Sequence, residues 1–410
     1  MTLANLRINI DRLTAHIEDL AEIGAIAGGG VCRMALTDED RQGRDMVLKW
    51  MYELGLEVTV DQIGNVIGIR AGQESGRPVM TGSHIDTVAS GGRYDGNLGV
   101  LAGLEVIATL NDAEITTRKP IGVGFFTNEE GSRFAPDMMG SGVHQGAFEL
   151  NSMLDVLDND GARVGDELEN IGYAGETSTG DFRADSFVEL HVEQGPILEL
   201  ENYEIGAVEG VQGISWNEYR IGGTANHAGT TPMRLRHDAG FVAAAISVET
   251  RRLANEMGAN QIGTVGVTKL NPGLINVIAK EALITIDLRN TDEQKLQEAE
   301  QAMSSFIEQL CKAEGVTFSS RTLARLEPVS FDKEMVSLVT ETASKLGFSV
   351  KSMPSGAGHD AQMFAPNCPT AMIFVPSRNG ISHNVAEFTE PRHLHAGADV
   401  LLQIMLQKSS

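Results

Sequence analysis

The chain has 410 residues, of which 42% are hydrophobic, and this combination suits a protein of two domains with sizeable cores. Its formal net charge of −24 argues against nucleic acid and against an anionic membrane as partners, since both repel an acidic surface. Three scattered cysteines are too few for a disulfide framework, so the cytoplasm is the expected compartment.

Residues 1–26 read as an amphipathic helix, because charged residues interrupt the apolar positions. Those charges argue against a secretory signal peptide, and no apolar run approaches the length that spans a membrane. Over the first two hundred residues, helical patterns alternate with short apolar runs and glycine-rich turns. This alternation predicts an α/β layer with a largely parallel sheet, in which ligands bind beyond the carboxyl ends of the strands.

Residues of the kind that bind metals follow the apolar pair Val79-Met80. His84 and Asp86 alternate along one face of an extended segment, so the Asp86 carboxylate can accept the spare imidazole N–H and orient His84 toward a metal. Asp95 lies just beyond, in a loop rich in glycine. Because glycine permits tight backbone conformations, this loop could bring one carboxylate close to two cations.

Two adjacent carboxylates, Glu129 and Glu130, come directly after the apolar run 121–126, which predicts a buried strand. Neighbours at a strand end point in different directions, so one carboxylate can bind a metal while the other moves protons. Taken alone, such a pair more often belongs to a solvated turn, and the other segments are what support a site here.

Two further segments supply histidines. Segment 188–195 places Glu189, His191 and Glu193 on one face of a strand, and a short loop after the apolar run 370–375 carries another histidine. A single histidine is more often a hydrogen-bonded structural residue than a ligand. Together, however, the segments offer three imidazoles and two carboxylates, which suit two zinc ions, with manganese or cobalt as substitutes. The candidate metal ligands are His84, Asp95, Glu130, His191 and His383.

From Ser215 the pattern changes, and it predicts an insertion with the element order β-α-β-β-α-β, which is ferredoxin-like. The expected domains are therefore a discontinuous catalytic domain, 1–212 and 328–410, and an inserted domain, 213–327. The predicted elements are strand 215–221, helix 235–257, strands 264–270 and 282–288, helix 292–313 and strand 316–323.

The insertion carries polar candidates of its own. A threonine before Pro232 predicts a capped helix start at this proline, which leaves the nearby His227 unexplained. Asn276 and Arg289 flank a hairpin-like region. The planar guanidinium of Arg289 can hold a carboxylate with two parallel hydrogen bonds, and a surface ion pair is the alternative.

Nearly the whole chain is spanned by an ordered series of motifs: GSHIDT, GGRYDGNLG, TNEEGSRF, ELHVEQG, NHAGTTPM, SGAGHDAQ and GISHN. The series resembles the N-carbamoyl-L-amino-acid hydrolase and allantoate amidohydrolase family, a branch of the di-zinc aminoacylase and carboxypeptidase superfamily. The resemblance implies an α/β, di-metal aminopeptidase-like catalytic domain with an inserted ferredoxin-like (α+β) domain for dimerisation and lid closure. Aminoacylase-like relatives carry Asp or Glu where this chain has His191, which favours the carbamoylase branch over peptidases.

The resemblance also implies roles for individual residues. Glu129 would take the proton of a water molecule activated by two divalent ions and pass it to the departing nitrogen. His227 would act in trans across a homodimer and stabilise the oxyanion in the partner's site. Asn276 and Arg289 would hold the carboxylate of the substrate.

Three residues are candidates for binding the ureido group, by resemblance and by their closeness to ligand segments. Gln194 follows the His191 strand, and Gly358 and His359 belong to the SGAGHD loop. A flexible turn is the alternative for that loop, and a structural hydrogen bond is the alternative for His359.

The leading functional hypothesis is hydrolysis of a linear N-carbamoyl-L-amino acid to the amino acid, carbon dioxide and ammonia. Allantoate hydrolysis is favoured by SGAGHDAQMFAP followed by GISHN, whereas GGRYDGNLGVLAGLE looks more like carbamoylases. β-Ureidopropionase activity would use the same site. A dipeptidase is the rival from another reaction class, and a metal-binding protein without catalysis would leave Glu129 idle.

Overall fold

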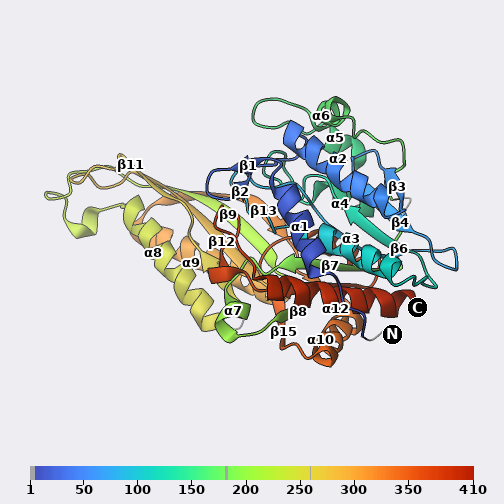
Figure 1. The fold of residues 1–410 in the computed structure, drawn as a ribbon. Coiled ribbons are helices and arrows are strands. Elements are labelled where there is room, and N and C mark those ends of the chain that lie inside the picture. Colours follow the sequence, from blue (N-terminus) through green and yellow to red (C-terminus); the bar gives the residue numbers. More distant parts are fainter. Residues whose placement is uncertain (1–4, 181–182, 259) are drawn as a thin grey trace. The chain divides into compact units, whose positions relative to one another are not determined.

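The computed structural model describes residues 5–180, 183–258 and 260–410, which form two compact units (Figure 1). The first unit consists of Met1–Gly210 and Phe331–Ser410, and the second is the continuous segment Val211–Ser330. Each unit has a hydrophobic core of its own. Among the described residues, no helix combines the length and the apolar character needed to cross a membrane.

A mixed sheet organises the first unit. Its four central strands are parallel and lie in the order β16 (Thr370–Val375), β7 (Ser186–Val192), β5 (Val79–Ser83) and β6 (Ile121–Phe125). The edges are antiparallel, which the prediction of a largely parallel sheet did not include. They are β4 (Val66–Arg70) and β3 (Glu57–Val60) beyond β6, and β8 (Ile205–Val211) beyond β16, with β15 (Val350–Ser355) pairing with β8.

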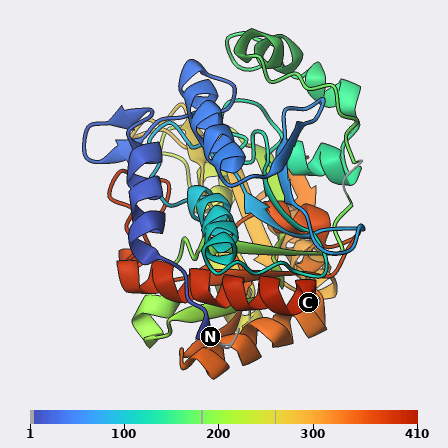
Figure 2. The same cartoon turned by 45° about the vertical axis from the view of Figure 1, so that its right-hand side comes forward.

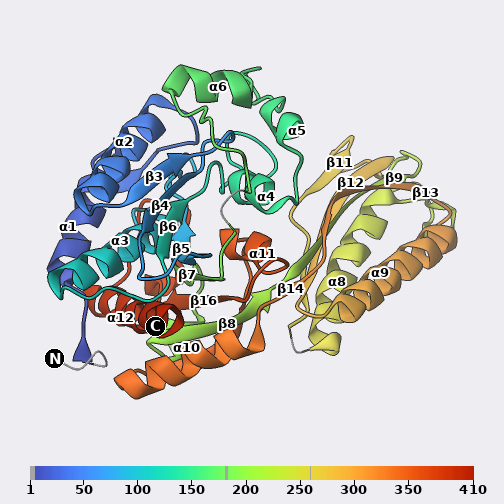
Figure 3. The same cartoon turned by 90° about the vertical axis from the view of Figure 1, so that its right-hand side faces the viewer.

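Helices cover both faces of this sheet. Helices α1 (Ile10–Ala21), α3 (Asn97–Asp112) and α12 (Pro391–Ser409) pack together (Figure 2), whereas α4 (Met139–Gln145) and α11 (Asp360–Phe364) lie on the opposite face (Figure 3). Strand β7 shows the reason, since alternate side chains face opposite sides of a sheet. Leu190 lies against Gly397 of α12, whereas Phe187 stacks on Phe364 of α11 with 3.9 Å between ring centroids. The remaining elements of the unit are the hairpin β1 (Ala25–Ile26) and β2 (Gly30–Val31), helices α2 (Asp38–Glu53), α5 (Leu150–Leu154), α6 (Val164–Ile171), α7 (Ile197–Glu201) and α10 (Lys333–Leu346), and the 3₁₀ turn η3 (Arg378–Gly380).

The N-terminal helix is shorter than the predicted range 1–26, of which residues 1–4 lie outside the described residues. Asn9 caps α1, because its side chain accepts hydrogen bonds from the backbone N–H groups of Asp11 and Arg12. After α1 the chain turns into the hairpin of β1 and β2, where Gly24 and Gly28 have φ angles of 80° and 95°. Glycine adopts such positive angles readily, so both positions favour the turns on either side of β1.

The second unit is an antiparallel sheet covered by two long helices (Figure 3). The strand order is β10-β12-β9-β13, with β11 also pairing with β12, and this is the order of a ferredoxin-like sheet. The expected role of the unit in dimerisation and as a lid stays a prediction. Its elements are β9 (Gly213–Gly222), η2 (Met233–Leu235), α8 (Ala239–Met257), β10 (Ile262–Thr264), β11 (Thr268–Asn271), β12 (Glu281–Asn290), α9 (Glu293–Glu314), β13 (Thr317–Leu326) and β14 (Val329–Ser330).

Two predicted boundaries in this unit are wrong. The start expected at Pro232 gives only the short 3₁₀ turn η2, which has no side-chain cap. Helix α8 itself begins at Ala239, where the Asp238 side chain caps it by accepting the N–H groups of Gly240 and Phe241. The single strand expected over 264–270 is divided into β10 and β11. Between them the Val267 N–H donates to the hydroxyl of Thr285, whereas the Val267 carbonyl oxygen accepts the backbone N–H of Thr285, both at 3.1 Å.

Candidate metal centre

The ligand-type residues meet at one edge of the sheet in the first unit. His84 directly follows β5, Glu129 and Glu130 follow β6, His191 lies near the end of β7, and His383 lies in the loop beyond β16. These four strands are adjacent and parallel, so their carboxyl ends share the same edge. The order of the strands therefore brings these segments together, as the sequence predicts.

Asp95 lies at the centre of this group and faces it with both oxygens. Its Oδ1 is 3.7 Å from His84 Nε2 and 3.1 Å from His191 Nε2. Its Oδ2 is 3.5 Å from His383 Nε2, and this nitrogen is 3.2 Å from Glu130 Oε2. Two groups of three potential ligands contain Asp95, and a further group consists of Glu189, His191 and His359.

Backbone carbonyls orient two of the imidazoles. His84 donates from Nδ1 to the carbonyl oxygen of Asp86 at 2.9 Å, and His191 donates from Nδ1 to that of Val192 at 2.8 Å. Each hydrogen bond fixes the tautomer and turns Nε2 toward Asp95. The Asp86 side chain was expected to accept the His84 proton, but it is 3.9 Å away. It accepts the N–H groups of Glu129 and Glu130 instead, both at 3.3 Å, and so holds the loop after β6.

Sequence reasoning missed Arg33, whose side chain forms hydrogen bonds to two of the loops that carry ligand-type residues. Its side chain is fully buried and donates to the carbonyl oxygen of Ile85 and to the side chain of Asn97, both at 2.8 Å. Gly96 sits between these loops, with a φ of 66°, and a Cβ at this position would collide with the ring of His84. A buried arginine that bonds mainly to carbonyl oxygens leaves no local sequence pattern, so it could not be predicted.

The two neighbouring glutamates take different positions. Glu130 Oε2 faces His383, whereas Glu129 Oε2 lies 3.3 Å from His84 Nε2 and belongs to none of the groups of three. Burial and the nearby carboxylate of Asp360 raise the pKa of Glu129 well above its ordinary value. The geometry therefore separates a ligand-type carboxylate from one that can exchange protons.

The charges of the cluster are those of a cation site. Burial, followed by repulsion from neighbouring carboxylates, raises the pKa values of Glu129 and Asp360. Burial also raises the pKa of Asp86 to about 7. Carboxylates crowded in this way are stabilised by positive charge, and imidazole nitrogen with carboxylate oxygen suits zinc, manganese or cobalt. The residues present thus fit a pair of divalent cations.

Three predicted substrate residues and Glu193 lie in the same unit. Gln194 donates from Nε2 to Asp95 Oδ2 at 2.8 Å, and Glu193 accepts the N–H groups of Ile197 and Leu198 at the start of α7. His359 is buried, packs edge-on against His191 and has Nε2 2.9 Å from the Ser355 hydroxyl. Its expected alternative, a structural hydrogen bond, is therefore present. Gly358 is a position where a Cβ would lie 2.9 Å from the Met138 methyl group, so a larger residue there would require the Met138 side chain to shift.

His227 and Asn276 lie side by side in the second unit. The Ala228 N–H donates to the Asn276 carbonyl oxygen at 2.9 Å, and the exposed imidazole of His227 accepts the N–H of Gly229 at Nδ1 at 3.0 Å. Because Nδ1 is an acceptor, the proton of the neutral ring is on Nε2. This loop therefore presents a hydrogen-bond donor to solvent.

Arg289 makes the ion pair that was its alternative interpretation. Its Nε and Nη2 bond to the two oxygens of Asp287 at 3.1 and 2.9 Å, and its guanidinium lies 5.8 Å from the centre of the Trp216 ring. A substrate carboxylate would have to join or replace Asp287. The role of Arg289 in substrate binding stays a prediction.

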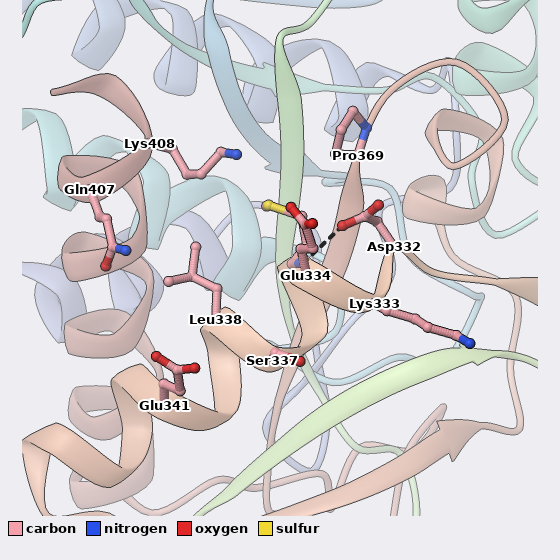
Figure 4. A pocket seen from close by; sticks show the side chains of 10 residues that line it. Asp332, Lys333, Glu334, Ser337, Leu338, Glu341, Pro369, Gln407 and Lys408 are labelled. Carbon is pink, nitrogen blue, oxygen red and sulfur yellow. Dashed lines mark hydrogen bonds between the residues drawn. The ribbon is translucent and has the colours of Figure 1, made fainter.

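A surface pocket of about 520 Å³ lies elsewhere in the first unit, between the start of α10 and the end of α12 (Figure 4). Among its described lining residues are charged side chains of both signs, such as Lys333, Glu334 and Lys408, and none of the predicted site residues. Asp332 at its rim accepts the Met335 N–H and caps α10. The volume of this pocket does not by itself indicate a reaction, so the cluster of metal-ligand side chains remains the candidate site.

Known proteins match the chain along nearly its whole length. Residues 80–407 match the model of peptidase family M20/M25/M40. An N-carbamoyl-L-amino-acid amidohydrolase of Rhizobium meliloti is 41% identical over 406 residues, covering 98% of this chain and 97% of that protein. An allantoate amidohydrolase of Bacillus subtilis is 35% identical over 396 residues, covering 96% of each chain.

A solved structure gives the same assignment for the fold. The hydantoinase/carbamoylase family amidase of Burkholderia multivorans superposes with a TM-score of 0.96 at 42% identity, covering 98% of each chain. The resemblance noted in the sequence motifs is thereby confirmed, together with the α/β fold class. The chain belongs to peptidase family M20/M25/M40 and, within it, groups with the hydantoinase/carbamoylase amidases.

Proposed function

We propose that this protein is a metal-dependent amidohydrolase that cleaves the ureido C–N bond of a linear N-carbamoyl-L-amino acid. The observation that carries the proposal is the shared Asp95, whose two oxygens face separate groups of ligands while Glu129 stays outside both. The names of the relatives support a ureido substrate over a peptide. Allantoate is the second candidate, because an allantoate amidohydrolase is 35% identical.

The proposed holders of one cation are His84, Asp95 and His191, and those of the other are Asp95, Glu130 and His383. Divalent cations supply Lewis acidity, which polarises a carbonyl group and makes water easier to deprotonate. Zinc is the expected metal, with manganese or cobalt as substitutes, because the donors are nitrogen and oxygen. The sharing of Asp95 supports two cations in each subunit.

Glu129 is the proposed proton carrier. It would take a proton from the attacking water and deliver it to the departing nitrogen, so that the amino acid leaves and the carbamoyl product decomposes to carbon dioxide and ammonia. In the metal-free cluster, burial and Asp360 keep its pKa high, and cations held nearby would lower that pKa again. The carboxylate would then be free to act as a base at neutral pH.

His227 is the proposed oxyanion donor, acting in the site of a second copy. Its Nδ1 is occupied by the N–H of Gly229, which leaves Nε2–H as the donor. Asn276, Arg289, Gln194, Gly358 and His359 complete the proposed substrate contacts. Arg289 suits a carboxylate because its planar fork can form two parallel hydrogen bonds.

Exposed apolar side chains of the second unit support a homodimer. Phe241 and Val248 lie seven positions apart on α8, so they project from the same face, and they are 53% and 70% exposed. Leu274 and Ile275 protrude from the loop after β11. Exposed apolar surface of this kind marks an interaction site, and a second copy is the proposed partner.

The test is ammonia release by the protein loaded with manganese or zinc. N-carbamoyl-L-amino acids, N-carbamoyl-β-alanine, allantoate and a dipeptide are offered in parallel, with the Glu129→Gln variant as the blank. Ammonia from the carbamoyl amino acids is the expected result. Preference for allantoate would select the second candidate, and dipeptide cleavage without ammonia would contradict both.

A further inference from the structure

A buried carboxylate outside the proposed ligand set joins two of the ligand loops. Glu387 lies in the loop before α12, four positions after His383, and is 5% exposed. Its Oε1 accepts the N–H groups of Tyr94 and Asp95, at 2.9 and 3.1 Å. The carboxylate therefore fixes the backbone of the central aspartate from a segment that is 292 positions away in the sequence.

The other oxygen of Glu387 reaches the residue beside His383. The Ser382 hydroxyl lies 3.2 Å from Glu387 Oε2 and 2.8 Å from Asp95 Oδ2. A hydroxyl has one proton, so it can donate fully to only one of these two carboxylates. If a cation drew on Asp95 Oδ2, the Glu387 carboxylate would still offer the Ser382 hydroxyl an acceptor, so the Ser382 loop would stay attached.

The surroundings of Glu387 are shaped around it. A Cβ at Gly92 would collide with the Glu387 carboxyl group, so only glycine leaves room for it. Next to it, Phe388 packs edge-on against Tyr94, with 5.9 Å between ring centroids. The Glu387 N–H donates to the Asn384 carbonyl oxygen at 3.0 Å. This backbone hydrogen bond closes a turn that links Glu387 to the segment of His383.

We propose that Glu387 is a positioning residue that clamps the loop of Asp95 to the loop of His383 and thereby sets the affinity for the cation held by Asp95, Glu130 and His383. The inference rests on the metal site of the proposed function and deepens it. Hydrogen-bond partners of metal ligands typically account for about 10-fold to 100-fold in metal affinity, which is the loss expected when this clamp is removed.

The experiment titrates Mn²⁺ into metal-free wild-type protein and into the Glu387→Ala variant, by calorimetry and by electron paramagnetic resonance. Wild-type protein is expected to bind two ions and to show the spectrum of an exchange-coupled pair. Glu387→Ala is expected to bind one ion as tightly as before and the second about 10-fold to 100-fold more weakly. Its spectrum at two equivalents should then contain the six-line signal of isolated Mn²⁺.

Asp399→Ala is the matched control, because Asp399 is an equally buried carboxylate that accepts a backbone N–H, that of Ile8, away from the cluster. It should lower the melting temperature and leave both manganese affinities unchanged. Glu387→Gln keeps an oxygen for the two N–H groups, so it should retain most of the affinity.

Gly92→Ala covers the case in which Glu387→Ala fails to fold, since the added methyl group displaces the carboxylate without removing it. Gly92→Ala should weaken the binding of the second ion. Where Glu387→Ala folds, adding Gly92→Ala to it should cost little more, because the carboxylate that the methyl group displaces is already absent. Full affinity for two ions in Glu387→Ala, or in Gly92→Ala if the former is unfolded, would overturn the inference alone. Failure of wild-type protein to bind two ions would instead overturn the proposed metal site.

Discussion

The two units hold their polar residues in opposite ways. In the first unit the ligand-type side chains, His383 apart, are nearly fully buried, and the orientation of His84 and His191 is fixed by backbone carbonyls. In the second unit His227 is exposed and held by local backbone contacts within its own turn. The first arrangement is preorganised by a core, whereas the second presents a group to solvent.

This difference indicates which substitutions should affect catalysis alone and which should also affect metal binding and stability. Loss of a metal-ligand side chain from the buried cluster leaves charges without compensation in a low dielectric, so metal binding and stability should change together. Loss of a group from an exposed loop should leave the fold untouched and appear only in catalysis. The predictions below test this contrast, beginning with the largest effect.

Glu129→Gln should abolish turnover while both metals stay bound. Removal of a general base typically costs about 100-fold to 10,000-fold in rate. Rate constants measured alongside metal content by mass spectrometry check this prediction. Loss of metal from Glu129→Gln but not from Glu130→Gln would show that the two glutamates have each other's roles.

His227→Ala should lower turnover about 100-fold to 1,000-fold, the usual cost of an oxyanion donor, with metal content and melting temperature unchanged. Mixing it with Glu129→Gln tests action in trans, since a mixed dimer contains one site with an intact Glu129 and an intact partner histidine. Activity should reappear after subunit exchange. Two inactive variants that stay inactive together, despite forming mixed dimers, would contradict the assignment.

Arg289→Lys should raise KM more than it lowers kcat, because the positive charge remains while the planar fork is lost. Hydrogen bonds to charged groups contribute about 1.5–3 kcal/mol, so a rise in KM of about 10-fold to 100-fold is expected. Arg321→Lys is a suitable control, since Arg321 forms an exposed ion pair with Glu218 on the same sheet. An unchanged KM in Arg289→Lys would contradict a role of this residue in substrate binding.

Metal binding should release protons and strengthen as the pH rises toward 9. The hydrogen bond to Glu130 raises the pKa of His383 to about 9. Burial alone would lower the pKa of His191, but the hydrogen bond and charge of Asp95 outweigh it and raise that pKa to about 9. A cation binds neutral imidazole, so below this pH it must displace a proton, and above it the affinity should level off. Calorimetry in buffers of different ionisation enthalpy measures the released protons, and an affinity that does not change with pH across this range would contradict the prediction.

Local sequence was sufficient for the part of the site that follows strand ends. Apolar runs followed by His84, by Glu129 and Glu130, and by His383 identify the segments, and parallel pairing brings such segments to a common edge. The same reasoning could not find Arg33 or Glu387. Their partners are mostly backbone groups far away in the chain, and such contacts exist only once the fold is known.

Helix and strand ends were the weaker part of the prediction, for local reasons. A proline preceded by threonine predicts a helix start at Pro232, yet Asp238 supplies a better cap because its side chain reaches two N–H groups. The side chain of Asp86 was assigned to His84, but the carbonyl oxygen of the same residue is the closer acceptor. Every residue has a backbone carbonyl oxygen, so the sequence does not show which of them accepts a given hydrogen bond. This limits what motif spacing can predict about hydrogen bonds.

The order of strands in the first unit has a consequence for biosynthesis. β16 lies between β7 and β8 in the sheet, although residues 193–204 alone separate β7 from β8 in the chain and β16 comes after the whole second unit. A nascent chain therefore cannot close this sheet until residues 370–375 have left the ribosome, whereas all strands of the second unit's sheet are available earlier. His383 and Glu387 emerge later still, so the proposed metal centre can be assembled only after the second unit has been synthesised in full.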